Sequence, residues 1–297
     1  MNFIVTGGRG FIGSHFVELC LEQGHSVIDI DFMGYCSNKI LPFDSNKNYK
    51  HLNIDIALIK HIPTCDVIVN FAAETHVDNS INDTAPFVHS NILGVHNLLE
   101  LVKGKNEYER PLFVQISTDE VYGDIADGEF SETDILKPSN PYSATKAAAE
   151  MLVLSYQRTY GLNYLITRSS NNYGERQYEE KLIPKSIRHI QEGKKIPLHG
   201  DGSYVRDWIY VKDNVSAIYH IITNQKQNEI YNIGSRNRMK NIDVVTDILN
   251  WFDKGREYIT FVQNRWGQDL RYALNTDKIE STGWKAIHSK GIHKWFN

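Results

Sequence analysis

Two pairs of side chains near the middle of the chain have residue types and a spacing that suit chemistry. Tyr142 and Lys146 are four residues apart, so on a helix they lie on the same face. A neighbouring ammonium lowers the pKa of a phenol, which lets the phenol act as a base near neutral pH. Asp119 and Glu120 are adjacent and offer a second acid–base pair. Oxidation by a nicotinamide cofactor followed by elimination of water is one of the few reactions that need both pairs.

Neither pair is specific by itself. A Tyr and a Lys at this spacing also occur on ordinary surface helices, and an Asp-Glu pair is more often part of a solvated loop. Their joint occurrence after a dinucleotide-binding pattern favours the catalytic interpretation. Two close carboxyls push their pKa values apart, so one is protonated while its neighbour is ionised, as an elimination requires.

The elements that must position these residues follow an alternating pattern. Short apolar runs predict strands, and periodic segments between them predict helices. The alternation predicts an α/β fold with a doubly wound (Rossmann) parallel sheet. The predicted strands are 2–6, 26–31, 49–54, 66–72, 112–117 and 162–169, and the predicted helices are 11–23, 85–103 and 142–160.

The segment TGGRGFIG connects the first predicted strand to the first helix. Gly7, Gly10 and Gly13 permit a tight turn and let backbone N–H groups approach a pyrophosphate at the helix N-terminus. Asp31 ends the next strand 18 residues after Gly13 and would hydrogen-bond the adenosine ribose. Its charge repels a 2′-phosphate, which favours NAD over NADP. Asp29 is the alternative ribose partner, but its inward position favours a structural role.

The pattern changes after about residue 172, where Gly, Pro and aromatic residues gather. Shorter helices are predicted at 212–223 and 241–251. We therefore predict that residues 1–172 form an NAD-binding domain with the catalytic residues. Residues 173–297 are predicted to form a smaller mixed α/β C-terminal substrate lobe, although the boundary is approximate and the chain can cross back. Ligands of open α/β sheets bind at the carboxyl ends of the strands, so the lobe is expected to close over that edge.

The composition argues against several classes of function. The formal net charge of -4 favours neither nucleic acid nor a membrane surface as a partner. The 3 cysteines have neither a CxxC motif nor metal-ligand spacing, which favours reduced thiols and no metal site. The sequence shows neither a signal-peptide pattern nor an apolar run long enough to span a bilayer. We therefore expect a cytoplasmic protein with a small-molecule substrate.

Longer strings resemble one family. The chain is similar to the extended short-chain dehydrogenase/reductases and, among them, to the nucleoside-diphosphate-sugar 4,6-dehydratases. The strings span almost the whole chain, and STDEVYG and NNYG…EKLIP are the most specific. Gln268 departs from the family, which usually has His there, and this concerns substrate contacts rather than the chemistry. The other matching strings are AAETHVDNSI, NPYSATKAAAE, RTYGL, ITRSSNNYG, GDGSYVRDWIYVKDN, YNIG and GQDLRYAL.

The resemblance implies a reaction and a role for each catalytic residue. Tyr142, assisted by Lys146 and Thr118, removes the proton of the sugar 4-hydroxyl while hydride passes from carbon 4 to NAD⁺. Glu120 then removes the proton on carbon 5, and Asp119 protonates the departing 6-hydroxyl. Hydride returns to carbon 6 and gives a 4-keto-6-deoxy sugar nucleotide. The implied substrate is dTDP-glucose, with UDP-glucose as the alternative, because thymine and uracil differ by one methyl group worth about 1 kcal/mol.

The resemblance also implies two sets of binding residues, and it implies no metal. The arginines would hold the diphosphate, because guanidinium forks suit phosphate oxygens. The NAD site would comprise Gly7, Gly10, Phe11, Ile12, Gly13, Asp31, Asp55, Ile56, Ala72, Ala73, Thr75, Tyr142 and Lys146. The sugar nucleotide would contact His76, Thr118, Asn171, Lys181, Leu182, Arg206, Asn241 and Arg271.

Some of these residues have ordinary structural explanations as well. His76 could be a buried histidine with satisfied hydrogen bonds. Arg206 could form a structural ion pair with Asp207 or Asp201. Asn241 could be a helix N-cap, a position that favours Asn.

Three other functions stay open at this point. A sugar-nucleotide 4-epimerase has the same fold, cofactor and Tyr–Lys pair, but neither it nor a sugar-nucleotide decarboxylase needs the acid–base pair of Asp119 and Glu120. Loss of Tyr142 or Lys146 would have suggested a catalytically silent NAD-binding regulator, and both are present. Members of the family commonly dimerise through two helices of each subunit, here 85–103 and 142–160, so we expect a homodimer.

Overall fold

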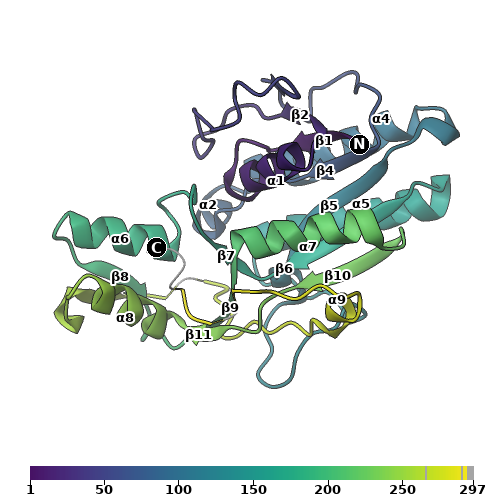
Figure 1. The fold of residues 1–297 in the computed structure, drawn as a ribbon. Coiled ribbons are helices and arrows are strands. Elements are labelled where there is room, and N and C mark those ends of the chain that lie inside the picture. Colours follow the sequence, from purple (N-terminus) through teal and green to yellow (C-terminus); the bar gives the residue numbers. More distant parts are fainter. Residues whose placement is uncertain (265, 289, 293–297) are drawn as a thin grey trace.

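A seven-stranded sheet organises the computed structural model, which describes residues 1–264, 266–288 and 290–292 (Figure 1). The strand order is β10-β6-β5-β4-β1-β2-β3, and the described pairings in this sheet are all parallel. The predicted doubly wound parallel sheet is therefore confirmed. Its strands are β1 (Asn2–Thr6), β2 (Ser26–Ile30), β3 (Tyr49–Leu52), β4 (Val67–Asn70), β5 (Leu112–Thr118), β6 (Tyr164–Ser169) and β10 (Glu229–Ile233).

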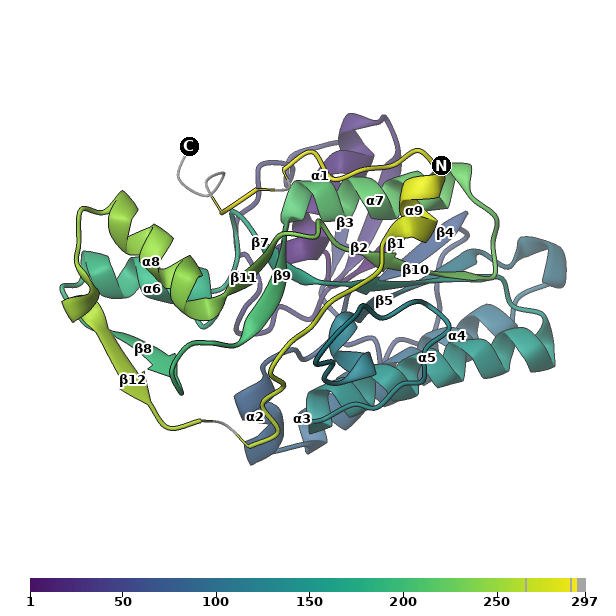
Figure 2. The ribbon, with the colours of Figure 1, turned by 90° about the horizontal axis from the view of Figure 1, so that it is seen from below.

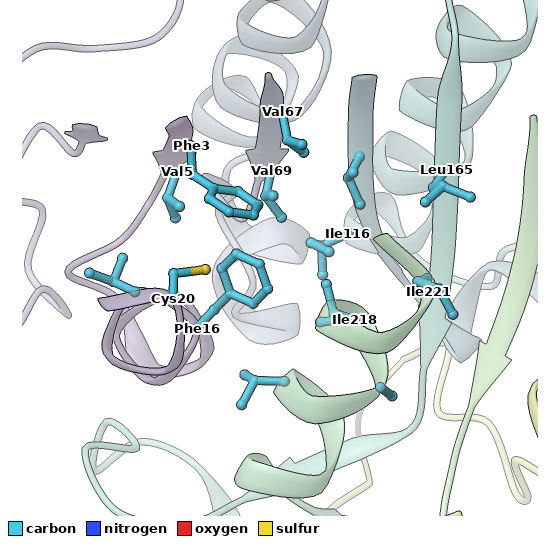
Figure 3. Close-up of a cluster of buried hydrophobic side chains, with 14 of the residues drawn as sticks. Phe3, Val5, Phe16, Cys20, Val67, Val69, Ile116, Leu165, Ile218 and Ile221 are labelled. Carbon is cyan, nitrogen blue, oxygen red and sulfur yellow. The ribbon is translucent and has the colours of Figure 1, made fainter. Parts of the chain in front are cut away.

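Helices cover both faces of this sheet, as Figure 2 shows. Figure 3 shows one of the two resulting cores, in which Phe16 of one helix and Ile218 of another face Phe3, Val69 and Ile116 of the strands. Burial of these side chains removes their apolar surface from water, which is the main force that holds the layers together. The helices of this face are α1 (Phe11–Glu22) and α7 (Val211–Asn224), and those of the other are α4 (Val95–Lys103) and α5 (Pro141–Tyr160).

The carboxyl ends of the central strands lie at the same edge of the sheet, where β5 and β6 extend beyond β1, β2 and β4. Thr6 pairs with Ile30 and Asn70, and Thr118 pairs with Ser169. The strands are short and apolar up to these ends, where the chain turns into loops. Polar side chains that follow the strands are therefore gathered at one edge of the sheet.

The start of α5 at this edge is fixed by local sequence. Asn140 caps the helix by accepting a hydrogen bond from the N–H of Ser143, and the Ser143 hydroxyl accepts one from the N–H of Asn140. This reciprocal capping box is followed by Pro141, whose missing N–H costs nothing in the first turn. The helix ends before Gly161, which has φ +69°. The first turn of α5, which carries Tyr142, is thereby held in place.

The predicted helix at 85–103 is interrupted. It comprises α3 (Ala85–Val88), a π-helical turn η1 (His89–Gly94) and α4. The side chain of Asn91 in the π turn reaches the backbone of Glu74, with its Oδ1 accepting the N–H at 2.8 Å and its Nδ2 donating to the carbonyl at 3.0 Å. The periodicity of apolar residues does not reveal such a turn, because the one extra residue of a π turn shifts the apolar face of the helix only locally.

The chain beyond residue 173 forms a smaller lobe and also returns to the main sheet. β10 pairs with β6, and α7 covers the main sheet. Both therefore belong to the main sheet and its helices, although the first elements of the lobe precede them in the chain. The lobe holds a three-stranded sheet, β11-β9-β7, and a parallel pair, β12-β8, and it is therefore mixed α/β as predicted. The division at residue 172 stays a prediction, and residues 293–297 lie outside the described residues.

The remaining elements are short or belong to the lobe. The strands are β7 (Asn171–Tyr173), β8 (Ile196–His199), β9 (Val205–Tyr210), β11 (Arg238–Lys240) and β12 (Ile259–Val262). The helices are α2 (Val77–Asn82), α6 (Leu182–Gln191), α8 (Asn241–Trp251) and α9 (Asp277–Ser281), with 3₁₀ turns η2 (Glu107–Glu109), η3 (Asp119–Tyr122) and η4 (Arg256–Tyr258). Within the described residues, none of the helices has the length and apolarity that a membrane span needs.

Candidate active site

Two cavities meet at the carboxyl edge of the sheet. The first, which we call the glycine cavity, is lined by the glycine loop (residues 6–13), Asp119, Tyr142 and Lys146. The second, the arginine cavity, is lined by Arg206 and other residues of the smaller lobe. A ligand in one cavity can therefore contact a ligand in the other. The residues that line both are Thr75, Glu120, Asn171, Asn172, Gln177, Glu180 and Lys181.

The glycine loop needs its glycines for close backbone packing. Gly7 has φ +68°, and a Cβ there would lie 2.7 Å from the backbone nitrogen of Ala72. A Cβ at Gly13 would lie 2.2 Å from the carbonyl oxygen of Gly7. The N-cap of α1 is Gly10, which offers no side chain to the first-turn N–H groups, so these groups suit an anion. The predicted residues of this loop that line the glycine cavity are Gly7, Gly10, Phe11, Ile12 and Gly13.

Asp31 lies beside the glycine cavity rather than in its wall. Its carboxylate accepts the N–H of Arg9 at 3.1 Å and the N–H of Met33 at 2.8 Å. It thereby holds the glycine loop against the connection at 32–48. Its role toward a ribose stays a prediction.

Asp29 points inward, as the sequence predicts. It accepts the N–H of Gly8 at 2.9 Å and the hydroxyl of Tyr49 at 2.8 Å, and burial raises the pKa of its carboxyl to about 7. Arg9 donates to the same Tyr49 hydroxyl and pairs with Asp44 at 2.8 Å. This network fixes the glycine loop to β2 and β3.

Three predicted NAD residues lie behind the cavity wall rather than in it. Asp55 contacts Nε2 of His89 at 2.8 Å, and Ile56 is buried against the π turn. Ala72 packs behind Gly7. The predicted residues of the neighbouring segment that do line the glycine cavity are Ala73 and Thr75.

The first turns of α5 bring Tyr142 and Lys146 into the glycine cavity together. Nζ of Lys146 donates to the carbonyl of Ile116 at 2.6 Å, and burial lowers the pKa of this ammonium to about 8. Burial, and then the carboxyl of Glu120, raise the pKa of Tyr142, while a hydrogen bond with Thr118 acts in the opposite direction. Burial thus outweighs the effect expected from Lys146.

Asp119 and Glu120 follow β5 directly and have unequal surroundings. Asp119 is 3% exposed, and its Oδ2 has no hydrogen-bond partner among the described residues. Burial, and then the charge of Glu120, raise the pKa of Asp119 well above its ordinary value. Burial also raises the pKa of Glu120, but Arg206 and Lys181 oppose that shift. The pKa of Asp119 is therefore raised more strongly than that of Glu120, which suits Asp119 to the role of acid and Glu120 to that of base.

The predicted sugar contacts gather in the wall of the arginine cavity. His76 is half-buried and has a structural hydrogen bond, since it caps α2 by accepting the N–H of Asn79 at 3.4 Å, and it also lines the cavity. Oδ1 of Asn171 is buried and, within the described chain, has no partner. Lys181 donates to the carbonyl of Thr75 at 3.1 Å and bridges the smaller lobe to the main sheet. The predicted residues in this wall are His76, Asn171, Lys181, Leu182, Arg206 and Asn241.

Arg206 is held by backbone carbonyls. Its guanidinium lies 4.2 Å from the ring centroid of Tyr272 and donates to the carbonyls of Val205 and Asp269 at 2.8 and 2.9 Å. Its bonds are therefore to carbonyl oxygens, not to Asp201 or Asp207 as the ion-pair explanation requires. A guanidinium that is held rigidly in a cavity wall is suited to a phosphate.

Asn241 is the first residue of α8 and not its N-cap, which is Lys240, so the N-cap explanation is wrong. Its Oδ1 is buried and has no hydrogen-bond partner in the described part of the chain. Because an unpaired buried oxygen costs free energy, this atom is suited to a donor on a ligand.

The structure does not bring Arg271 to the arginine cavity. Its backbone N–H donates to Asp124, and its guanidinium donates to the carbonyls of Ile125 and Gly128, the latter at 2.9 Å. Tyr272, the next residue, points into the cavity instead. Adjacent residues of an extended segment point to opposite sides, which explains the difference from the prediction.

Sequence reasoning missed other residues of the cavity walls. Glu180 lines both cavities, and its carboxylate lies 3.9 Å from Nε2 of His76. Asp269 accepts the hydroxyl of Tyr272 at 2.6 Å within the arginine cavity. The signal was present, because EKLIP begins with Glu180 and GQDLRYAL contains Asp269 and Tyr272. The described chain holds no cluster of three or more His, Cys, Asp or Glu placed for a metal ion.

Comparisons with known proteins agree with this architecture. A family model described as GDP-mannose 4,6 dehydratase matches residues 4–290. A low-salt glycan biosynthesis protein, Agl12, of Haloferax volcanii is 44% identical over 96% of this chain and 93% of its own length. dTDP-glucose 4,6-dehydratase 1 of Escherichia coli is 39% identical over 99% of this chain and 91% of its own.

A solved structure is similar as well. The dTDP-glucose 4,6-dehydratase DesIV of Streptomyces venezuelae, with NAD and TYD bound, is 36% identical and has a TM-score of 0.92 over 96% of this chain and 92% of its own. The resemblance drawn from the sequence is thus confirmed, and the chain belongs to the GDP-mannose 4,6-dehydratase family within the extended short-chain dehydrogenase/reductases.

Proposed function

We propose that this protein is an NAD-dependent hydro-lyase that converts dTDP-glucose to the 4-keto-6-deoxy sugar nucleotide. The observation that carries the proposal is the unequal acid pair where the two cavities meet. Burial raises the pKa of Asp119 well above its ordinary value, and Glu120 lies in both cavity walls. An epimerase has no use for such a pair. The relatives whose names state this activity support the same reading.

The glycine cavity suits NAD. Its wall is backbone at Gly7 and Gly13, the N-terminus of α1 offers N–H groups to a pyrophosphate, and Asp31 disfavours a 2′-phosphate. The bound cofactor supplies reversible hydride transfer. We assign Ala73 and Thr75, which line the cavity, to the same site.

The first proton transfer belongs to Tyr142. Its phenolate oxygen takes the proton of the sugar 4-hydroxyl as carbon 4 is oxidised to a ketone, and the hydride from carbon 4 would pass to the bound cofactor. Thr118 holds the phenol by a hydrogen bond, and the Lys146 ammonium, fixed on the carbonyl of Ile116, stabilises the phenolate.

The ketone at carbon 4 acidifies the proton on carbon 5, and the two carboxyls then act on neighbouring carbons. Glu120 removes the proton from carbon 5. Asp119 gives its proton to the 6-hydroxyl, which leaves as water. Reduction at carbon 6 and reprotonation of carbon 5 complete the product without net change of oxidation state.

The arginine cavity is assigned to the nucleotide diphosphate. Arg206 is the cation held for the phosphates, and Lys181 and Asn241 lie in the same wall. His76 and Asn171 are placed for the sugar, closer to the acid pair. Arg271 is left out of this assignment because its guanidinium donates to carbonyls elsewhere.

Parallel turnover assays with dTDP-glucose and UDP-glucose test the proposal. The alkali-induced absorbance of the keto product is followed for the wild type, Tyr142→Phe and Glu120→Gln. We expect product from dTDP-glucose, and its loss by roughly 100-fold or more in both variants. If keto product forms only from UDP-glucose, the substrate is the uridine nucleotide instead.

A different product would overturn the proposal. Formation of a galactose-type sugar nucleotide from UDP-glucose, without keto product and with activity kept in Glu120→Gln, would make the protein an epimerase. Bound NAD, measured by absorbance after denaturation, serves as the control for an intact glycine cavity in each variant.

We also propose that the protein is a homodimer. The support is an apolar surface, which we call the helix face, on the side of neighbouring helices that points away from the sheet. It includes Leu93 of η1 and Met151 of α5, which are 51% and 49% exposed, and Val88 of α3. Paired helices of two copies would remove these side chains from water.

A further inference from the structure

A buried ion pair lies beneath the catalytic residues and is not used by the mechanism. Glu150 and Arg168 are 0% and 2% exposed, and their side chains approach within 2.7 Å. The guanidinium donates three hydrogen bonds to the carboxylate, from Nε to both oxygens and from Nη2 to one. Neither residue lines the glycine or the arginine cavity. The pair is therefore not a ligand contact.

The Glu150 end of the pair holds α5 to β5. Oε1 of Glu150 accepts the hydroxyl of Ser117 at 2.5 Å. Ser117 precedes Thr118 in β5 and is register partner of Arg168 in β6, so the three side chains join two strands and one helix. Glu150 is also four residues after Lys146, one helical turn away on the same side of α5.

The Arg168 end of the pair holds the acid turn. Nη1 of Arg168 donates to the hydroxyl of Tyr122 at 2.7 Å, and its guanidinium lies 4.7 Å from the centroid of that ring. Tyr122 is the last residue of η3, the turn that begins with Asp119 and Glu120. Its hydroxyl donates in turn to Asn232 of β10 at 2.8 Å.

We propose that Glu150 and Arg168 are positioning residues that set the distance between the Tyr142–Lys146 face of α5 and the Asp119–Glu120 turn. The role rests on the proposed function, because that reaction requires both groups at one sugar ring. A single buried pair connects three elements: α5, which carries the base, β5, which carries Thr118, and η3, which carries the two acids. A shift of one of them is thereby resisted by the other two.

The charges around Lys146 give the proposal a second consequence. Glu150 faces it from its own helix, and the carboxyls of the η3 turn face Tyr142 from the other side of the cavity. Glu150 raises the pKa of Lys146 against the larger effect of burial. Without the Glu150 charge, Lys146 would lose its proton at lower pH.

Glu150→Asp and the double variant Glu150→Gln/Arg168→Met test the proposal. The double variant removes both charges together, because one unpaired buried charge would unfold the protein. We expect kcat to fall roughly 10- to 100-fold with KM nearly unchanged in Glu150→Asp, whose shorter side chain cannot reach both partners. In the double variant we expect the alkaline limb of kcat to move to lower pH.

A readout other than turnover accompanies these assays. The pH dependence of acetylation of Lys146, read by mass spectrometry of its peptide, is expected to move to lower pH in the double variant. Glu100→Gln is the matched control, since Glu100 of α4 pairs with Lys103 and accepts the hydroxyl of Tyr156, which lies toward the far end of α5. It should change neither kcat nor the Lys146 titration.

The outcomes separate the two proposals. Absence of keto product from the wild type would contradict the proposed function, whereas the Lys146 titration still tests the charge effect of Glu150. Wild-type kcat in Glu150→Asp would overturn the positioning role, whether or not the double variant folds. If the double variant folds and the pH dependence of Lys146 acetylation is unchanged, the proposed charge effect of Glu150 is overturned.

Discussion

At the scale of residues, burial assigns different tasks to two adjacent carboxyls. Asp119 turns into the protein and has an Oδ2 with no partner in the described chain, while Glu120 faces both cavities near Arg206. The sequence alone identifies the pair, but not which member is the acid. That assignment follows from desolvation and from the nearby cations, which are both products of the fold.

Asp119→Asn separates the acid from the base. Because burial raises the pKa of Asp119 and disfavours its charged form, a neutral Asn of nearly the same shape should be tolerated, and we expect the variant to fold normally. It cannot donate a proton to the 6-hydroxyl, and keto product should fall by roughly 100-fold or more. Exchange of the carbon 5 hydrogen with deuterated solvent should persist, since Glu120 is intact. Mass spectrometry of the recovered sugar nucleotide measures this exchange.

Glu120→Gln provides the comparison for this measurement. It should lose both product and carbon 5 exchange, because the base itself is removed. Equal loss of exchange in Asp119→Asn would mean that the two carboxyls do not have separate roles.

At the scale of elements, the glycine loop is held by acids with opposite pKa shifts. Asp29 joins the loop to β3 through Tyr49, and burial raises the pKa of its carboxyl to about 7. Asp44 joins the loop to the connection at 32–48, and a hydrogen bond from Arg9 lowers the pKa of its carboxyl. Their contributions to stability therefore depend on pH with opposite signs.

Asp29→Asn is expected to raise the unfolding temperature at pH 8 relative to the wild type. A carboxyl with a raised pKa in the folded state contributes stability below its unfolded pKa of 3.8, and this contribution is lost as pH rises through about 7. Asn keeps an oxygen for the N–H of Gly8 and has no charge to bury. Thermal unfolding at pH 4 and pH 8 measures the difference, which should be smaller at pH 4.

Asp44→Asn is the control with the opposite sign. The lowered pKa of the Asp44 carboxyl stabilises the folded state at pH values above the pKa of the unfolded state. The variant should therefore be less stable than the wild type at pH 8, and this difference should disappear as the pH falls. The same direction of change in both variants would contradict this account of the loop.

The elements also show what can be read from sequence. The strands at 2–6 and 26–30 and the helix at 241–251 follow local apolar patterns and were predicted within a residue. The π turn of η1 was missed, because its cause is the distant backbone of Glu74 that Asn91 holds. Arg271 lies outside the arginine cavity for a similar reason, since its guanidinium donates to the carbonyls of residues 125 and 128. Contacts between residues far apart in sequence leave no local period to detect.

At the scale of the whole molecule, the chain crosses between its two parts more than once. The return of β10 and α7 to the main sheet places Asn232, on β10, against Tyr122 at the end of the acid turn. Family motifs predicted many of the residues that line the two cavities because they carry this arrangement implicitly. Periodicity alone could not, since it gives strands but not their order in the sheet.

The helix face provides the last test, which concerns assembly. Met151→Arg places a charge among Leu93, Val88 and the neighbouring apolar residues of α3, η1 and α5. If two copies bury this surface together, an unpaired charge in it costs several kcal/mol and should yield a monomer. Sedimentation velocity at micromolar concentration measures the mass, and the unfolding temperature shows that the subunit stays folded, because Met151 is 49% exposed in one chain. Tyr108→Arg is the control, since Tyr108 is 96% exposed on the separate turn η2 and its change should leave the mass as it is. A dimeric Met151→Arg, or a wild type that sediments as a monomer, would contradict the proposed use of this face.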